Sequence, residues 1–183
     1  MFKPTKTLSL DCYVDADFAG LWGYEDDQDP VCVRSRTGYV MTMGNCPIHW
    51  TSKLQTEISL STTEAEYIAL CQAFRELIPL RRAFDDMLKA FNLTAQCPPS
   101  VKSQIFEDNN GAISTATSPK MSPRTKHIAV KYHFVKDYFA KRKLEDHPFS
   151  IVKIDTLEQK ADIFTKGTNE VNFLSFRKLL CHY

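Results

Sequence analysis

The spacing of hydrophobic residues changes along the chain, and this change limits the possible folds more than any other feature. Between Leu10 and Phe18, apolar and polar residues alternate, which predicts a β-strand with two unlike faces. From Leu60 to Phe91, apolar residues recur every three or four positions, which predicts a long amphipathic helix that Pro79 bends or restarts. A chain with both periods must pack helices against a sheet.

Further strands and helices surround that long helix in the sequence. Strand-like runs at 37–43 and 46–52 flank Gly44-Asn45, a strong turn signal, and predict a hairpin after the first strand. Beyond a loop at 97–100, the pattern predicts strands at 104–108 and 149–154 and helices at 112–116, 126–143, 157–166 and 171–180. This order predicts an α/β fold in which a mixed sheet is flanked by helices.

Length and composition fit one domain. The chain has 183 residues, of which 43% are hydrophobic and 25% charged, and ~100–200 residues is usual for a globular domain. Its apolar runs are far shorter than the ~18–20 residues of a membrane-spanning helix, and its first residues lack the apolar core of a secretory signal. We therefore expect an intracellular protein without a membrane partner, with an N-terminal extension at 1–7 and the domain at 8–183.

The cysteines and charges narrow the possible sites. Six cysteines without a CxxC pair, and no histidine pair at finger spacing, argue against a zinc site and predict reduced, mostly buried thiols. The net charge is only +1, but residues 120–144 carry eight Lys or Arg and the single acid Asp137, whereas acids gather at 25–29. Either run can be an ordinary solvated surface.

Acidic residues stand where predicted elements begin or end. They are Asp15 late in the first strand, Glu66 in the first turn of the long helix, Asp108 at a strand end and Asp162 in a late helix. Taken singly, each is equally explained by the preference of acids for helix N-termini and element ends. If they converge, their repulsion requires cations between them, and oxygen ligands suit Mg²⁺ or Mn²⁺. Two such ions ~3.5–4 Å apart can cleave phosphodiesters.

Six sequence blocks around these acids occur in one order and cover most of the chain. They are YVDADFAG (13–20), SRTGYVM (35–41), SKLQTEISLSTTEAEYIAL (52–70), EDNNGAI (107–113), RTKHIAVKYHFVKD (124–137) and EQKADIFTK (158–166). Together, from about Leu8 to about Leu180, the chain resembles the ribonuclease H domain at the end of the Pol polyprotein of copia-type LTR retrotransposons.

The resemblance implies a fold, an activity and partners. It implies a ribonuclease H-like fold with a five-stranded mixed sheet, and hydrolysis of the RNA strand of an RNA–DNA hybrid. By matching motifs, it implies that two divalent cations, Mg²⁺ or Mn²⁺, are bound by Asp15, Glu66, Asp108 and Asp162. It further implies a reverse transcriptase domain of the same polyprotein as partner, and a location in a cytoplasmic virus-like particle or in the nucleus.

One feature departs from the wider family. Cellular and retroviral ribonucleases H carry a histidine in the loop before the fourth acid, whereas residues 153–157 contain none. Copia-type relatives also tend to lack it. We therefore expect slower proton handling or product release without loss of activity, and a histidine placed in this loop should raise turnover.

The basic segment matches a role in substrate binding. Proteins recognise hybrids of this kind largely through backbone phosphates and 2′-hydroxyls, and the candidate contacts are Arg124, Lys126, Lys131 and Lys136. The alternative is that these side chains only face solvent.

Three other functions are compatible with parts of this pattern. A catalytically weak or domesticated fragment of the same fold would bind nucleic acid without cleaving it, but it would be expected to lack one of the acids. An integrase or transposase of the same superfamily would show a different motif order, a widely spaced final glutamate and often a zinc-binding segment. A remnant of a longer polyprotein, inert without its reverse transcriptase, is also compatible with the sequence.

Two neighbouring glutamates at the start of the long helix need separate roles. Ser61 and Glu64 have the S-x-x-E spacing of a capping box, although Thr63 and Glu66 offer a competing frame. Glu66 shares a helix face with apolar residues, where an unpaired carboxylate would be costly. This argument and the resemblance both favour Glu64 as the cap and Glu66 as the metal ligand.

Overall fold

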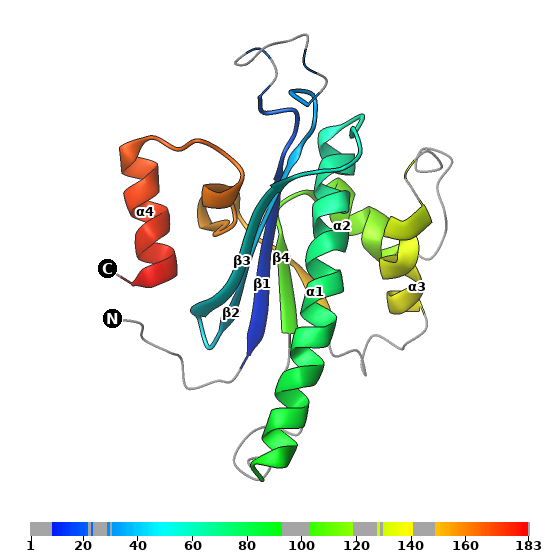
Figure 1. Ribbon diagram of the computed structural model, residues 1–183, viewed down its shortest axis with the longest axis vertical. Helices are drawn as coiled ribbons and strands as arrows, with labels where there is room; N and C mark the ends of the chain where they lie inside the picture. The colour runs from blue at the N-terminus through cyan, green and yellow to red at the C-terminus, as the bar shows by residue number, and fades with distance from the viewer. Residues whose placement is uncertain are drawn as a thin grey trace.

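A five-stranded mixed sheet lies at the centre of the structure (Figure 1). The computed structural model describes residues 9–21, 23, 29, 31–92, 103–118, 128, 130–140 and 149–182. The sheet consists of β1 (Leu10–Asp17), β2 (Arg36–Met43), β3 (Cys46–Leu54), β4 (Ser103–Glu107) and β5 (Phe149–Lys153), in the order β3-β2-β1-β4-β5. Neighbours are antiparallel from β3 to β1 and parallel from β1 to β5. This arrangement confirms the predicted five-stranded mixed sheet.

The hairpin between β2 and β3 turns where the sequence predicted. Gly44 and Asn45 have φ angles of 53° and 69°, the left-handed conformation that both central residues of a tight hairpin turn adopt. The turn joins Met43 directly to its partner Cys46. The strands on either side therefore enter the sheet in a fixed register.

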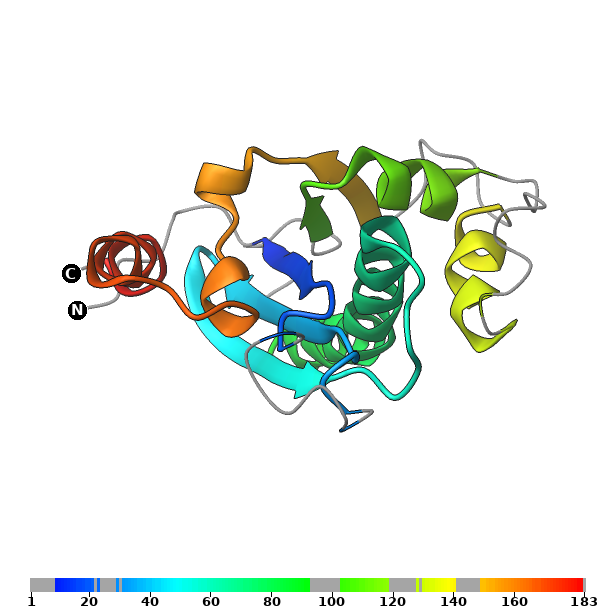
Figure 2. The same cartoon turned by 90° about the horizontal axis from the view of Figure 1, so that it is seen from above.

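Helices cover both faces of the sheet (Figure 2). On one face lie α1 (Thr62–Ala90) and α2 (Asn110–Thr117), and the 3₁₀ turn η3 (Val130–His133) with α3 (Phe134–Ala140) packs beyond them. On the other face lie the 3₁₀ turns η5 (Thr156–Glu158) and η6 (Asp162–Phe164) and helix α4 (Glu170–Cys181). Among the residues just described, no helix is both long and apolar enough to cross a membrane.

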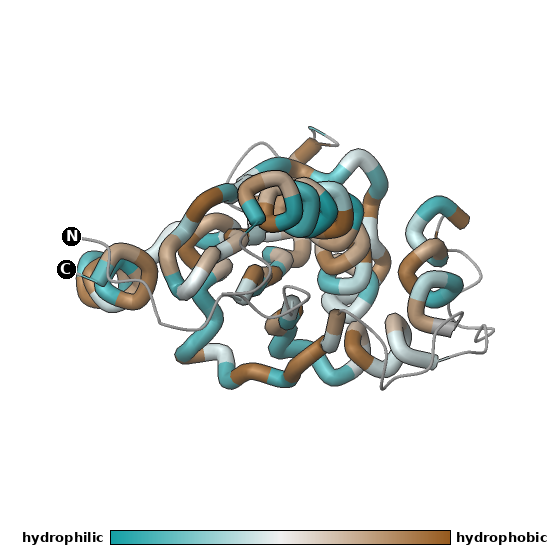
Figure 3. Tube along the Cα trace, turned by 90° about the horizontal axis from the view of Figure 1, so that it is seen from below, coloured by the Kyte–Doolittle hydropathy of each residue, from teal (hydrophilic) through white to brown (hydrophobic). Residues whose placement is uncertain are grey.

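The core lies between α1 and the sheet. Cys12, Val14 and Ala16 of β1 are buried there, which confirms the predicted alternation, whereas Phe18 lies beyond the strand end and is exposed. Phe74 of α1 sits in an aromatic cluster with Phe134, Tyr138, Phe139 and Phe149, at centroid distances of 5.0–6.0 Å. Helices α1 and α4, seen nearly end-on in Figure 3, each carry both hydrophobic and hydrophilic residues around their circumference, as expected of helices with one packed face.

Of the two effects predicted for Pro79 in the long helix, a bend or a restart, the restart is wrong. Helix α1 runs through Pro79 as one element of 29 residues. The helix is buried on both sides of the proline, at Leu77 and at Arg81, and Arg81 also pairs with Asp85 at 3.1 Å. Tertiary packing therefore outweighs the backbone hydrogen bond that proline removes.

Two other helices are shorter than their sequence patterns suggested. The first of them was predicted at 126–143, and residues 130–133 of that range form the 3₁₀ turn η3. There the Tyr132 carbonyl accepts hydrogen bonds from the Tyr67 hydroxyl and the Cys71 thiol, each at 3.0 Å, and these bonds favour the turn. Positions 126–127, 129 and 141–143 lie outside the described residues, as does the proposed extension at 1–7. The helix predicted at 157–166 is instead two 3₁₀ turns around the fully buried Gln159.

Gln159 explains why that segment is irregular. Its side-chain amide donates to the carbonyl of Val14 in β1 at 2.9 Å and to that of Phe106 in β4 at 3.5 Å. A regular helix would hold this side chain away from the strand ends. The segment also passes close over Gly38 of β2, where an added Cβ would lie 2.6 Å from Thr165 and 2.9 Å from Phe164.

Candidate active site

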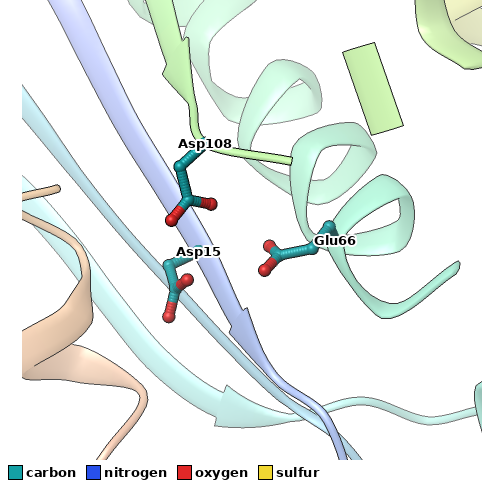
Figure 4. A group of neighbouring side chains, drawn as sticks. All are labelled: Asp15, Glu66 and Asp108. Atoms are coloured by element: carbon teal, nitrogen blue, oxygen red, sulfur yellow. The ribbon is translucent and has the colours of Figure 1, made fainter. Parts of the chain in front are cut away.

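Three carboxylates from three different elements point toward one another at one end of the sheet (Figure 4). Asp15 lies in β1, Glu66 lies in the second turn of α1, and Asp108 is the residue that follows β4. One oxygen of each lies within 4.8 Å of the others. Because β1 and β4 are parallel, their ends lie side by side, and the packing of α1 on the sheet adds the glutamate.

The fourth predicted acid, Asp162, is not part of this group of three. It begins the turn η6, and it is joined to Asp15 through Lys166, whose ammonium lies 3.1 Å from Asp162 Oδ1 and 3.4 Å from Asp15 Oδ2. The Thr165 hydroxyl also donates to Asp15 Oδ2. The structure therefore brings the four acids to one region, with three grouped closely and Asp162 held next to them by a lysine.

Burial and mutual repulsion perturb these acids. Glu66 is 7% exposed, and burial, together with the negative charges of Glu107, Asp15 and Asp108, raises its pKa to about 11. Burial and the charge of Asp15 raise the pKa of Asp162 to about 6, although Lys166 opposes this. Burial alone would lower the pKa of Lys166, but Asp15 and Asp162 raise it overall.

The group fits a divalent cation. Glu66 Oε2 is buried without a hydrogen-bond partner, which is costly for a carboxylate unless a proton or cation is bound. The donors are hard carboxylate oxygens, the type that Mg²⁺ and Mn²⁺ prefer. Asp108 Oδ2 accepts a hydrogen bond from the Thr156 hydroxyl at 2.7 Å, which comes from the loop at 153–157.

Two further charged residues, Glu107 and Lys166, lie beside these acids and were not predicted from the sequence. Glu107 is fully buried beside the group; burial, followed by the charges of Asp108 and Asp15, raises its pKa well above the usual range. Its position two residues after buried Ile105 in a short strand was a signal for an inward-facing side chain. Lys166 stands four residues after Asp162, a spacing at which opposite charges commonly pair.

The two glutamates of α1 have the separate environments that the sequence argument favoured. Ser61 is the N-cap, and its hydroxyl accepts from the Glu64 backbone N–H at 3.2 Å. The Glu64 carboxylate turns back to accept from the Leu60 N–H at 2.9 Å, one residue before the position that a standard capping box uses. Glu64 is therefore the cap, while Glu66 faces the acids.

Two of the four predicted substrate contacts, Lys131 and Lys136, lie among the described residues. Arg124 and Lys126 lie outside the described residues. Lys136 is only 7% exposed, and burial lowers its pKa. Lys131 is exposed, pairs with Glu57 and lies 5.0 Å from the Tyr132 ring centroid.

Lys131 lines a pocket of about 540 Å³ between α1, η3 and the end of β3. Two further cations, Lys53 and Arg75, line it, as do Glu76 and the polar side chains of Thr56, Gln72 and Tyr132. Glu76 Oε2 also lies 3.4 Å from His49 Nε2. The pocket lining thus includes three basic side chains and one acidic side chain.

Several known proteins with similar sequences are polyproteins of transposons. The chain is 34% identical over 176 residues to the retrovirus-related Pol polyprotein from transposon RE2 of Arabidopsis thaliana, which is 96% of this chain and 11% of that protein. It is 35% identical over 155 residues to the corresponding polyprotein from transposon TNT 1-94 of Nicotiana tabacum, covering 84% of this chain and 10% of that protein. The chain thus spans about a tenth of the length of these curated relatives.

Other comparisons concern shorter matches or the fold. The chain is 36% identical over 77 residues to secreted RxLR effector protein 161 of Plasmopara viticola, which is 42% of this chain and 49% of that protein. The solved structure of LC11-RNase H1, isolated from compost by a metagenomic approach, superposes with a TM-score of 0.47 and 18% identity, over 87% of this chain and 94% of that chain. No protein-family model matches the sequence.

Proposed function

Because the chain is homologous, over nearly its whole length, to one segment of the retrovirus-related Pol polyproteins of transposons, we propose that it is a metal-dependent ribonuclease H. Its substrate is the RNA strand of the RNA–DNA hybrid formed during reverse transcription. The observation that carries this proposal is the convergence of Asp15, Glu66 and Asp108 within 4.8 Å at the end of the sheet.

In the proposed mechanism, the side chains bind and orient the reacting groups. Asp15, Glu66 and Asp108 hold a divalent cation, and Asp162 with Asp15 extends the site toward a second. Bound Mg²⁺ or Mn²⁺ supplies activation of water and stabilisation of the leaving oxygen. Thr165 and Thr156 fix the carboxylates of Asp15 and Asp108 through hydrogen bonds, so that the ligands keep their orientation.

The pocket beside Lys131 supports a second element of the proposal, which is contact with the nucleic-acid backbone. Gln72 and Pro79 on α1 stand six and thirteen residues from Glu66, which corresponds to ~9 and ~20 Å along a helix. A phosphate bound there is therefore remote from the scissile bond and helps only to position the strand. The change Arg75→Ala should make the plot of log binding constant against log salt concentration less steep, by the amount that about one phosphate contact contributes. The rate of the cleavage step should not change.

Partner and location follow from the same proposal. The hybrid arises where a reverse transcriptase acts, so the partner is the reverse transcriptase part of the same polyprotein. The place is a cytoplasmic virus-like particle or the nucleus.

A cleavage assay tests the activity. A labelled RNA–DNA hybrid is incubated with the protein in Mg²⁺ and in EDTA, beside Asp108→Asn and the matched cap variant Glu64→Gln. We expect cleavage only with the cation, loss in Asp108→Asn and retention in Glu64→Gln. Cleavage that survives EDTA or the aspartate change would refute the mechanism. Hybrid binding without cleavage in the unchanged chain would instead favour a nucleic-acid-binding fragment of the same fold.

A further inference from the structure

Lys166 divides the acidic site into two unequal halves. Its ammonium contacts Asp15 Oδ2 at 3.4 Å and Asp162 Oδ1 at 3.1 Å. The Asp15 and Asp162 side chains are 1% and 13% exposed, so the lysine neutralises carboxylates that water barely reaches. The half of the site between β1 and η6 already holds a cation that belongs to the chain.

The other half of the site has no such counterion. Glu66 Oε2 is buried without a hydrogen-bond partner, and Glu66 and Asp108 take part in no ion pair among the residues that the structure describes. Asp15 has a carboxylate oxygen in the group of three, while its Oδ2 receives the Thr165 hydroxyl and the Lys166 ammonium. The same aspartate therefore belongs to an open half and to a filled half.

We infer that Lys166 competes with a divalent cation for the Asp15–Asp162 half, so that the free protein binds one cation tightly and a second only when Lys166 moves away. The inference rests on the proposed function, because it concerns the cations of the same site. It adds an order of binding, first at Asp15, Glu66 and Asp108 and then at Asp162, together with the residue that imposes it.

Lys166 is built to leave without disturbing the ligands. Its side chain is 40% exposed, and its long flexible stem can move while the backbone stays. Asp15 stays oriented by the hydroxyl of Thr165, which is the residue before Lys166. An arriving phosphodiester offers the ammonium another anion, so substrate and second cation should bind together.

Counting bound Mn²⁺ tests the inference without any cleavage measurement. The substrate-free protein is titrated with Mn²⁺ and the free ion is followed by electron paramagnetic resonance, for the unchanged chain, Lys166→Gln and Lys166→Arg. Lys89→Met serves as the control, because Lys89 is an exposed lysine paired with Asp86 far from the site. We expect one tight Mn²⁺ in the unchanged chain, Lys166→Arg and Lys89→Met. In Lys166→Gln, we expect a second Mn²⁺ whose affinity is raised roughly tenfold or more.

A second variant keeps the test decisive if Lys166→Gln does not fold. Asp162→Asn should keep the first Mn²⁺ with little change in affinity, because that cation is held by the other three acids. Loss of the first Mn²⁺ in Asp162→Asn would overturn the order of binding, as would equal second-site affinity in Lys166→Gln and the unchanged chain. If none of the proteins binds Mn²⁺, the metal site and the proposed function fail together.

Discussion

Replacing Glu66 with glutamine should stabilise the cation-free protein. Glu66 is 7% exposed, and its pKa is raised to about 11 by burial and by Glu107, Asp15 and Asp108. At pH 7 without a cation, the folded protein therefore carries this acid protonated, whereas the unfolded chain ionises it near its ordinary value of 4.5. Taking up that proton on folding costs free energy, which a neutral glutamine of the same shape avoids.

The magnitude depends only on the pH of the assay, as long as the folded pKa stays above it. The interval of roughly 2.5 pH units between 4.5 and 7 corresponds to about 3 kcal/mol, at ~1.36 kcal/mol per unit. The folded state binds more protons than the unfolded state, so stability is greatest below pH 4.5 and falls as the pH rises toward 11. At pH 5 the advantage of Glu66→Gln should shrink to below about 1 kcal/mol.

Urea unfolding in EDTA at pH 5 and pH 7 measures this difference. The control is Glu64→Gln, the same change at the cap two residues earlier, which should cost up to about 1 kcal/mol because it removes a charge near the helix N-terminus. Adding Mn²⁺ should stabilise the unchanged protein and leave Glu66→Gln nearly unaffected. If Glu66→Gln is no more stable than the unchanged protein at pH 7 in EDTA, or if its advantage does not depend on pH, the electrostatic reasoning is wrong.

Three further substitutions test how the fold supports the site. Gln159→Leu should cost about 1–3 kcal/mol in urea unfolding, because it leaves the strand carbonyls that Gln159 bonds without a donor; an unchanged midpoint would contradict this. Gly38→Ala should weaken Mn²⁺ binding and lower stability by about 1–3 kcal/mol, because its methyl group would push Thr165 and η6 away from β2; unaltered Mn²⁺ affinity would show that η6 accommodates it. Phe74→Ala should cost about 3–5 kcal/mol by calorimetry, since it empties the aromatic cluster; a loss below 1 kcal/mol would show that the cluster refills the space.

Local patterns were sufficient wherever one element determines its own geometry. The β1 alternation, the Gly44-Asn45 turn and the Ser61 cap each depend on residues within a few positions, and each is found where expected. The strand and helix ends that bring acids together could also be predicted, because parallel neighbours end at the same edge of a sheet. The resemblance to transposon polyproteins is confirmed by relatives that match nearly the whole chain.

The errors arose where distant residues decide a local structure. Gln159 interrupts a helical pattern because two strand carbonyls lie where its amide can reach them. Tyr132 begins a 3₁₀ turn because Tyr67 and Cys71 bond its carbonyl from α1. These hydrogen-bond partners are distant in sequence, so the spacing of hydrophobic residues along the chain cannot predict them.

Because these acids are buried, the local stability of the fold around the site depends on their charge more than on packing. Asp15, Glu66, Glu107 and Asp162 are all at most 9% exposed, and Lys166 pairs with only two of them. Such a cluster in a low-dielectric environment must bind protons or cations, and each proton taken up above its ordinary pKa reduces the stability of the fold. A core chosen for stability alone would place apolar residues at these positions, because buried charges are seldom net stabilising. The same acids are tolerable if a divalent cation replaces the protons, so the least stable part of the cation-free fold is the part where a ligand can stabilise it most.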